Sequence, residues 1–191
     1  MTDVDAVSSE NEKLIAVDGN DREIGQVSKA MAHDGEGTLH RAFSIFLFND
    51  KGEVLLQQRS ADKRLWPLYW SNTCCSHPRV GEDISTATVR RLEQELGMQS
   101  DLTYLFKFQY QAKFGPQGSE NELCSVYVGQ AIDEPQLHPR EIAAVKWLSV
   151  EAVTRELAAD TKGERYTPWF NLEWRRLVGE FGDRLSEFKR T

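Results

Sequence analysis

The chain has 191 residues, a formal net charge of −7 and ordinary fractions of hydrophobic (40%) and charged (28%) residues, which is typical of one globular domain with a buried core. The acidic balance gives no support to nucleic-acid binding, and no apolar run approaches the roughly 18 residues that a membrane-spanning helix needs. Three cysteines, two of them adjacent, do not suit a disulfide framework, and residues 1–12 lack a signal-peptide layout, so we expect a cytoplasmic protein.

The first half of the chain alternates short strands with tight turns. Residues 1–12 are polar and acidic, which predicts a loose N-terminal tail. Turn residues such as Asp18 and Gly19 then separate hydrophobic runs. The elements predicted here are strands at 14–17, 39–48 and 53–59, a short strand at Cys75, and a helical turn at 27–32.

The second half adds longer helices. The elements predicted here are a helix at 84–96, strands at 102–113, 120–130 and 143–148, a helix at 150–159, and a helix that starts at Pro168 and buries apolar residues as far as Phe188. In the first of these helices Asp83 is the expected N-cap, Gly97 the C-terminal stop, and Val89, Leu92 and Leu96 the packed face. Hairpins mixed with helices indicate layers of an α/β or α+β fold around one sheet.

The segment from Thr73 to Pro78 holds a candidate reaction centre. Pro78 disfavours a helical conformation at His77, and in an extended segment Cys75 and His77 point to the same side, with Cys74 on the other. A thiol beside a histidine on a rigid strand can serve catalysis. The alternative is a half-buried strand end in which the cysteines are small buried apolar side chains.

Imidazoles and carboxylates provide a second candidate site. Glu120 and Glu122 lie two apart in a predicted strand, so both carboxylates face one way and repel each other unless a cation or a shared proton relieves them. A cage of nitrogen and oxygen ligands for Mn, Mg or Zn would comprise His33, His40, His77, Glu120 and Glu122. The alternative is a set of solvated surface residues, because these positions lie far apart along the chain.

Basic and aromatic residues form two further sets. Lys29, Arg59, Lys63 and Arg91 would suit a diphosphate if they lie together, and are otherwise solvated surface charges. The aromatic set is Trp66, Trp70, Tyr110 and Trp169. These rings suit a core, although a ring that faces a site can also stabilise a cation.

The order and spacing of these motifs resemble the type I isopentenyl-diphosphate isomerases, a branch of the Nudix fold, from about residue 13 to 180. The matching motifs are His33 with His40, Trp66-Pro67 with Trp70, Asn72 to Pro78, Glu120 to Cys124, and Thr167 to Phe170. A trace of the Nudix signature persists at Glu82, Arg90, Leu92, Glu95, Gly97 and Met98. Ser76 stands in place of its first glycine, and Arg91 and Gln94 replace carboxylates that hydrolases use.

The resemblance implies a layered α/β sandwich around a mixed β-sheet, with residues 13–191 as one catalytic domain after the 1–12 tail. It implies interconversion of isopentenyl and dimethylallyl diphosphate, with Glu122 and Tyr110 as proton donor, Cys75 as acceptor, and Trp169 facing a carbocation. The direction of the Cys75 and Glu122 roles stays open. The alternatives are a Nudix pyrophosphohydrolase and a non-catalytic module that binds a metal or a diphosphate.

The same resemblance implies two divalent ions and an anion clamp. One ion is bound by His33, His40, His77, Glu120 and Glu122. Glu95 and the backbone carbonyl of Cys75 help to hold Mg²⁺ on the diphosphate. The clamp consists of Lys29, Arg59, Lys63 and Arg91, with a contact from Ser76. Cys74 departs from the expected small or apolar residue. We expect a monomer acting on a small diphosphate, with no nucleic-acid or membrane partner.

Overall fold

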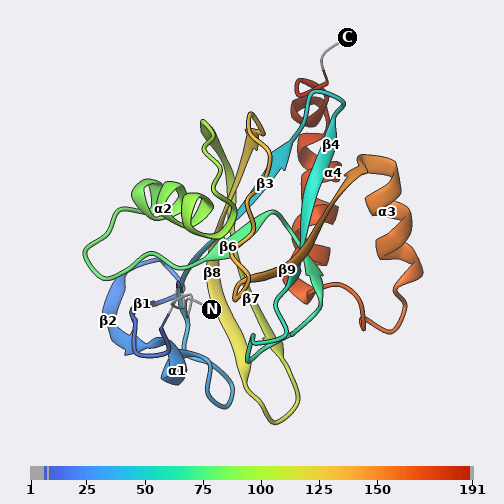
Figure 1. Cartoon of the computed structure of the whole chain (residues 1–191). Helices are drawn as coiled ribbons and strands as arrows, with labels where there is room; N and C mark the ends of the chain where they lie inside the picture. Colours follow the sequence, from blue (N-terminus) through green and yellow to red (C-terminus); the bar gives the residue numbers. More distant parts are fainter. Residues whose placement is uncertain (1–6, 8, 190–191) are drawn as a thin grey trace, which may run out of the picture.

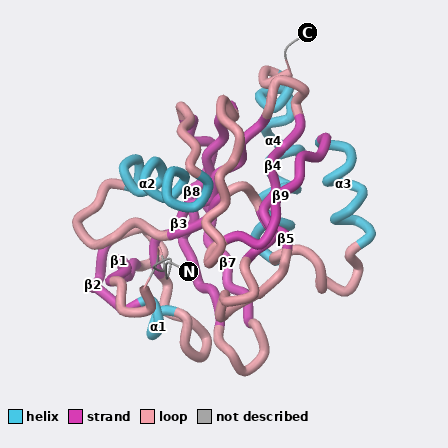
Figure 2. Tube along the Cα trace, viewed as in Figure 1, coloured by secondary structure: helices cyan, strands magenta, loops and turns pink. Residues whose placement is uncertain are grey.

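The computed structural model describes residue 7 and residues 9–189, whose strands form one nine-stranded mixed sheet (Figure 1, Figure 2). The strands are β1 (Lys13–Val17), β2 (Glu23–Ser28), β3 (His40–Phe48), β4 (Glu53–Arg59), β5 (Trp70–Ser71), β6 (Cys74–Ser76), β7 (Leu102–Lys113), β8 (Ser119–Gln130) and β9 (Ile142–Ser149). The helices are α1 (Lys29–Ala32), α2 (Ile84–Leu96), α3 (Val150–Ala159) and α4 (Pro168–Ser186). None of the helices in these residues is long and apolar enough to span a membrane.

Strand β3 is the centre of the sheet. It runs parallel to β8 and antiparallel to β1, β4 and β6. Phe46 and Phe48 pack with α3 and α4, whereas Ile45 and Leu47 pack with α2, so helices cover both faces of this strand (Figure 1). A strand buried on both faces explains the nearly continuous apolar run in its sequence. The expected α/β sandwich around a mixed sheet is therefore confirmed.

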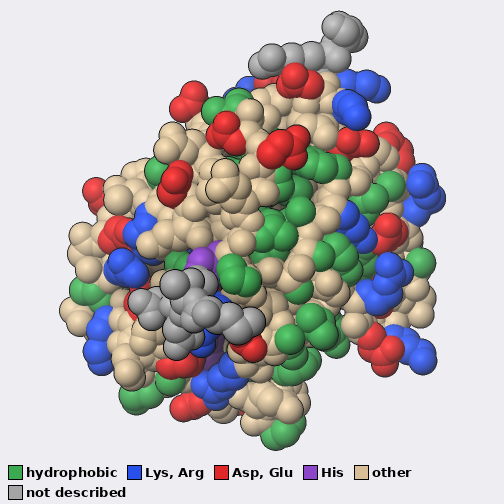
Figure 3. All heavy atoms as spheres, in the orientation of Figure 1, with side chains coloured by type: hydrophobic (Ala, Val, Ile, Leu, Met, Phe, Trp, Pro, Cys, Tyr) green, Lys and Arg blue, Asp and Glu red, His purple; other side chains and the backbone are tan. Residues whose placement is uncertain are grey.

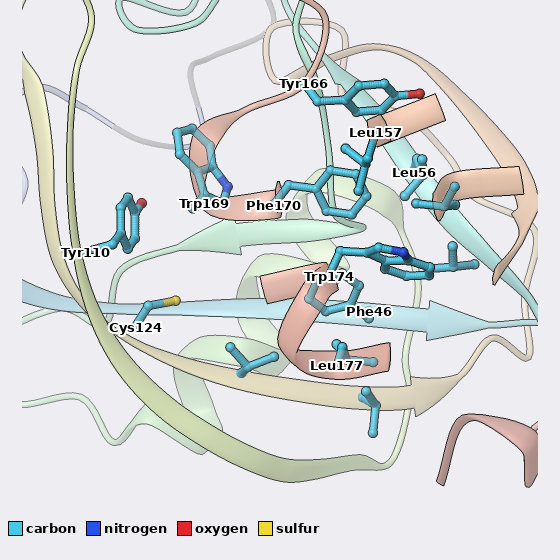
Figure 4. Packing of buried hydrophobic residues seen from close by; sticks show 14 of the residues in the cluster. Phe46, Leu56, Tyr110, Cys124, Leu157, Tyr166, Trp169, Phe170, Trp174 and Leu177 are labelled. Atoms are coloured by element: carbon cyan, nitrogen blue, oxygen red, sulfur yellow. The ribbon is translucent and has the colours of Figure 1, made fainter. Parts of the chain in front are cut away.

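The larger core cluster lies between the sheet and α4 and extends to the candidate site. Phe46 packs against Phe170 and Trp174, with ring centroids 6.0 and 6.2 Å apart. Tyr110 and Trp169 belong to the same cluster and lie at one end of it in Figure 4. Because close-packed cores hold side chains in fixed rotamers, the core packing fixes the positions of these two aromatic side chains.

The structure corrects the start of one predicted helix and the buried face of another. The helical turn predicted at 27–32 begins only at Lys29, because β2 continues to Ser28, whose hydroxyl accepts a hydrogen bond from Met31 N–H as the N-cap. In α2 the boundaries are as predicted, with Gly97 in the left-handed conformation (φ 62°). Val89, however, is 50% exposed, and the buried face contains Ala87 instead.

Helix α4 ends earlier than its apolar pattern predicts. Phe181 has a non-helical conformation (φ −128°, ψ 18°), and Phe188 lies beyond the last helical residue, Ser186. The two phenylalanines still pack as the pattern requires. Phe181 stacks on Phe106, and Phe188 stacks on Phe48 with ring centroids 5.0 Å apart. The kink therefore preserves the apolar contacts while it interrupts the helix.

Residues 9–12, which the sequence assigns to the tail, contact α1. The N–H of Ala30 donates to the Glu10 carbonyl (3.0 Å), and the N–H of Lys29 donates to the Glu12 carbonyl (2.9 Å). Most of the predicted tail, residues 1–6 and 8, lies outside the described residues.

Candidate active site

A cavity of about 400 Å³ collects most of the predicted site residues. Those that line it are Lys29, His33, Arg59, Lys63, Cys75, Ser76, His77, Arg91, Tyr110, Glu120, Glu122 and Trp169. His40 is fully buried beside the lining residues, and Glu95 is buried against Arg91. On the face shown in Figure 3, histidine is visible near the centre, with Lys and Arg side chains close by.

Three histidines and two glutamates form a buried cluster at the base of this cavity. One potential ligand atom from each of His33, His40, His77, Glu120 and Glu122 lies within 4.8 Å of all the others. The register explains this convergence, since β3 starts with His40 directly opposite Glu122 of β8. His33 follows α1, and His77 follows β6, which pairs with β3. Five residues far apart in the sequence thus meet at one end of the central strands.

Hydrogen bonding fixes the tautomer of His40. Its Nδ1 lies 2.7 Å from the Thr38 carbonyl oxygen, which can only accept, so Nδ1 carries the proton. Its Nε2 therefore presents a lone pair toward the cluster, and this buried atom has no hydrogen-bond partner among the described residues. A histidine oriented by a carbonyl in this way is the usual arrangement of a metal ligand.

The spacing of the cluster also fits a divalent cation. His33 Nε2 and Glu120 Oε2 lie 3.0 Å apart, yet neither atom is in a well-formed hydrogen bond. Neighbouring ligands of an octahedral ion at about 2.1 Å are themselves about 3 Å apart, so the two atoms are spaced as ligands of a common ion. Buried imidazoles and carboxylates in this arrangement could hold a metal ion.

The cluster distributes its protons unevenly. Burial raises the pKa of Glu120, but the charge of His33 outweighs burial and lowers it to about 2. Burial and the charge of Glu120 raise the pKa of Glu122 well above its usual value. Burial and neighbouring imidazoles lower the pKa of His77 well below its usual value, and burial lowers that of His40 to about 4. His40 and His77 are therefore neutral, as metal ligation requires, and Glu122 is the carboxyl that holds a proton.

Glu122 belongs to the buried cluster and also lines the cavity. Its Oε1 lies 2.9 Å from His77 Nε2, and its Oε2 accepts a hydrogen bond from the Tyr110 hydroxyl at 2.6 Å. Tyr110 lies opposite Glu122 in the β7–β8 ladder, which explains this contact. The Tyr110 ring is tilted by 34° against Trp169 with centroids 6.1 Å apart. The carboxyl of Glu122, the phenol of Tyr110 and the indole of Trp169 thus form one continuous part of the cavity wall.

Cys75 also lines the cavity, and Cys74 points elsewhere. Cys74 is fully buried in the cluster beneath α2, whereas Cys75 is half-buried, as the extended backbone predicts. Burial raises the pKa of Cys75 to about 12, although the positive charge of Arg59 opposes this shift. The Nη1 atom of Arg59 lies 4.0 Å from the sulfur, and its guanidinium lies over the Trp169 ring at 5.3 Å. At neutral pH the thiol therefore carries its proton in the free protein.

A basic region adjoins the thiol. Lys29, Lys63 and Arg91 line the cavity there, but none is a plain surface charge. Lys63 is paired with Glu141, and Arg91 is paired with Glu95 and Glu141. Arg91 and Glu95 are charged residues of an amphipathic helix, yet both are 2% exposed and face the interior.

Two buried glutamates were missed by sequence analysis. Glu141 lines the cavity, and Glu173 lies one helical turn after Trp169 on α4. Neither belongs to a spacing pattern, since their partners are distant in sequence. An isolated acidic residue in an amphipathic segment is normally a surface residue.

The backbone of Gly118 lies against the carbonyl group of His33, so a substitution at Gly118 tests how His33 is positioned. It has φ +138°, and a Cβ there would lie 2.1 Å from the His33 carbonyl oxygen, which also accepts the Ser119 N–H at 3.0 Å. We expect Gly118→Ala to displace His33 and to weaken Mn²⁺ binding by about 10-fold or more, measured by titration calorimetry. Gly179→Ala is the control, because a Cβ there meets no atom within 4 Å. Unchanged affinity in Gly118→Ala would refute this link.

Glu173 predicts a pH dependence of stability. It is fully buried with its Oε2 unpartnered among the described residues, and burial raises its pKa to about 8 despite hydrogen bonds from Ser44 and Cys124. The unfolded chain releases this proton near pH 4.5, so Glu173 destabilises the fold increasingly as pH rises from about 4.5 to 8.

We expect Glu173→Gln to gain stability relative to the parent over this pH range, by a few kcal/mol at about 1.4 kcal/mol per pKa unit. Urea unfolding of both proteins at pH 5 and pH 9 measures the difference. Comparison with the parent cancels the histidine contributions, which both proteins share. A stability difference that does not change with pH would contradict the shifted pKa.

Comparisons with known proteins agree with this architecture. A NUDIX domain model matches residues 38–170. The structure resembles the DR0079 protein of Deinococcus radiodurans, with a TM-score of 0.70 and 24% identity over 86% of this chain and 98% of that chain. It also resembles a MutT NUDIX hydrolase of Burkholderia pseudomallei, with a TM-score of 0.58 and 17% identity over 73% of this chain and 98% of that chain. The fold is thus that of a Nudix-domain protein.

Curated relatives narrow this class. The isopentenyl-diphosphate Delta-isomerase 1 of Photorhabdus laumondii is 42% identical over 176 residues, which cover 91% of this chain and 99% of the relative. The isopentenyl-diphosphate Delta-isomerase of Serratia proteamaculans is 40% identical over 84% of this chain and 88% of the relative. The chain belongs to the isopentenyl-diphosphate Delta-isomerase family, within the Nudix fold.

Proposed function

We propose that this protein interconverts isopentenyl diphosphate and dimethylallyl diphosphate by moving a proton across an allylic system. The observation that carries the proposal is that one cavity is lined by the Cys75 thiol, the Glu122–Tyr110 pair and the ring of Trp169. An unactivated double bond is a weak base, so a positioned acid must protonate its terminal carbon. A second group must then remove a different proton from the resulting tertiary cation.

The residues divide these tasks as follows. Glu122, with Tyr110 hydrogen-bonded to it, delivers the proton. Cys75 accepts the proton that leaves, which requires that the thiol of the free protein first releases its own proton to solvent; in the reverse reaction the roles exchange. Trp169 faces the cation and helps to exclude water, since a wet chamber would capture the cation as an alcohol. Arg59, 4.0 Å from the Cys75 sulfur, favours the thiolate. A divalent ion held by the His/Glu cluster would lower the proton affinity of Glu122.

The basic region would bind the diphosphate. Arg91 supports this assignment, because its buried Nε and Nη1 atoms have no hydrogen-bond partner among the described residues. Lys29, Arg59 and Lys63 would complete the clamp with Ser76, which also lines the cavity. Glu95 and the Cys75 carbonyl are our candidates for holding Mg²⁺ on the diphosphate. Mn, Mg or Zn would suit the His/Glu cluster.

We further propose that residues 13–191 act as one catalytic domain in the cytoplasm, as a monomer without nucleic-acid or membrane partners. The acidic net charge of −7 supports the part of this proposal that concerns nucleic acid.

Proton NMR of isopentenyl diphosphate incubated with the metal-loaded protein tests the function. We expect the dimethylallyl methyl signals to grow while the diphosphate stays intact. A parallel incubation with nucleoside di- and triphosphates tests for pyrophosphate hydrolysis. Release of phosphate or nucleoside monophosphate, without conversion of isopentenyl diphosphate, would favour the hydrolase instead.

A further inference from the structure

The cavity contains a carboxylate, Glu141, to which the proposed reaction gives no role. Glu141 directly precedes β9, is 3% exposed and lines the cavity. Its N–H donates to the His138 carbonyl at 3.0 Å, and its own carbonyl accepts the Ser60 N–H at 2.9 Å. These bonds fix Glu141 against the loop that carries Lys63.

One oxygen of Glu141 joins two cations from separate elements. Lys63 Nζ donates a hydrogen bond to Oε2, and Arg91 Nη2 lies 3.6 Å from the same oxygen. The same Arg91 nitrogen donates to Glu95, so both carboxylates contact one end of the guanidinium. The Nε and Nη1 atoms are left buried and unpaired within the described part of the chain. Glu141 and Glu95 therefore fix one end of the guanidinium of Arg91, a residue that lines the cavity.

Simple electrostatics makes this carboxylate unexpected in an anion site. A negative charge repels a diphosphate, so removal of Glu141 would by Coulomb's law alone strengthen binding. Glu141 is nevertheless ionised at neutral pH: burial raises its pKa, but the charges of Lys63 and Arg91 outweigh burial and lower it. Long lysine and arginine side chains lose conformational entropy when an anion immobilises them. Fixing them in advance reduces that loss and can outweigh the repulsion.

We propose that Glu141 is a positioning residue, whose carboxylate holds Lys63 and Arg91 in the geometry that binds the diphosphate before the substrate arrives. The proposal rests on the proposed function only in taking the bound anion to be the diphosphate end of the substrate. Glu141 touches no reacting atom. Its effect should therefore fall on binding and KM, and leave kcat nearly unchanged.

Two variants test the role with inorganic diphosphate and Mg²⁺ as the probe. Glu141→Gln removes the charge and keeps the size, and we expect its Kd for diphosphate and its KM for isopentenyl diphosphate to rise about 10-fold or more. Glu141→Asp keeps the charge but withdraws it by one methylene, and we expect it to lie between Gln and the parent. The kcat of both variants should stay within about 3-fold of the parent, because the groups that transfer protons are unchanged.

A matched control exists elsewhere in the chain. Asp21 also bridges an arginine and a lysine, Arg41 and Lys107, but does not line the cavity. Asp21→Asn removes a similar bridge, and it should leave diphosphate binding unchanged. Near-UV circular dichroism and Mn²⁺ binding verify that each variant is folded.

The outcomes separate the two proposals. If the parent binds diphosphate and Glu141→Gln binds it equally well or more tightly, Glu141 acts only as a repelling charge and the positioning role is wrong. If the parent itself binds no diphosphate, both the anion site and the positioning role fall. If the parent binds diphosphate but converts no isopentenyl diphosphate, the proposed function fails, while the Kd values for diphosphate still decide the role of Glu141.

Discussion

Replacing Cys75 by alanine, or Glu122 by glutamine, should lower the rate of isomerisation by about 10²–10⁴-fold or more, which is the usual contribution of one positioned acid or base. Each change removes a group that transfers a proton, and water cannot substitute for it in a chamber walled by Trp169 and Tyr110. The assay is conversion of isopentenyl diphosphate, followed by NMR at saturating substrate.

Cys74→Ala is the matched control for Cys75→Ala. The two cysteines are adjacent, but Cys74 is fully buried in the cluster under α2, and only Cys75 lines the cavity among the described cysteines. Cys74→Ala should therefore cost some stability and leave the rate per folded molecule close to that of the parent. Substantial turnover in Cys75→Ala, or loss of turnover in Cys74→Ala, would contradict the assignment of the reactive thiol.

Removal of divalent ions should abolish turnover and destabilise the fold together. Without a cation, burial and the charge of Glu120 raise the pKa of Glu122, which makes it a weaker proton donor, and the ligand atoms of His33 and His40 stay unpaired among the described residues. A ligand at 100 to 1,000 times its Kd stabilises the folded state by about 2.7–4.1 kcal/mol. Treatment with a chelator, followed by calorimetry and the NMR assay, measures both effects.

Two histidine substitutions separate the loss of metal binding from other effects of replacing a histidine. His40→Ala removes a ligand, whereas His138→Ala changes a histidine that is not part of the cluster. We expect His40→Ala to lose both Mn²⁺ binding and the stability gain from Mn²⁺, and His138→Ala to retain both. Full turnover in the chelated parent protein would show that the cluster does not serve the reaction.

Most strands were predictable because their patterns are local. The bounds predicted for β7, 102–113, agree with the structure, and those for β9 differ by one residue at each end. The helix errors arise where tertiary contacts override local pattern. Val89 continues the apolar spacing of α2 but faces solvent at 50% exposure, because the interior positions of that helix are used by Arg91 and Glu95.

The residues that meet in the cavity were predictable as types but not as neighbours. Alternation along an extended segment correctly grouped Cys75 with His77 and Glu120 with Glu122. No local rule brings His33 and His40 to them. The position of His40 depends on the parallel pairing of β3 with β8, and that of His33 on its carbonyl accepting the Ser119 N–H; spacing specifies neither contact. Glu141 was missed for the same reason, since its partners Lys63 and Arg91 belong to other elements.

The most direct test of the account is conversion of isopentenyl diphosphate in D₂O by the metal-loaded protein. If Glu122 and Cys75 donate and accept different protons, dimethylallyl diphosphate formed early in the reaction, by a single forward conversion, should carry one deuterium in a methyl group, with its diphosphate intact. Deuterium should be absent when Glu122→Gln replaces the parent. Product that keeps all of its original hydrogens would show that a single group returns the same proton, and would contradict an acid and a base acting separately.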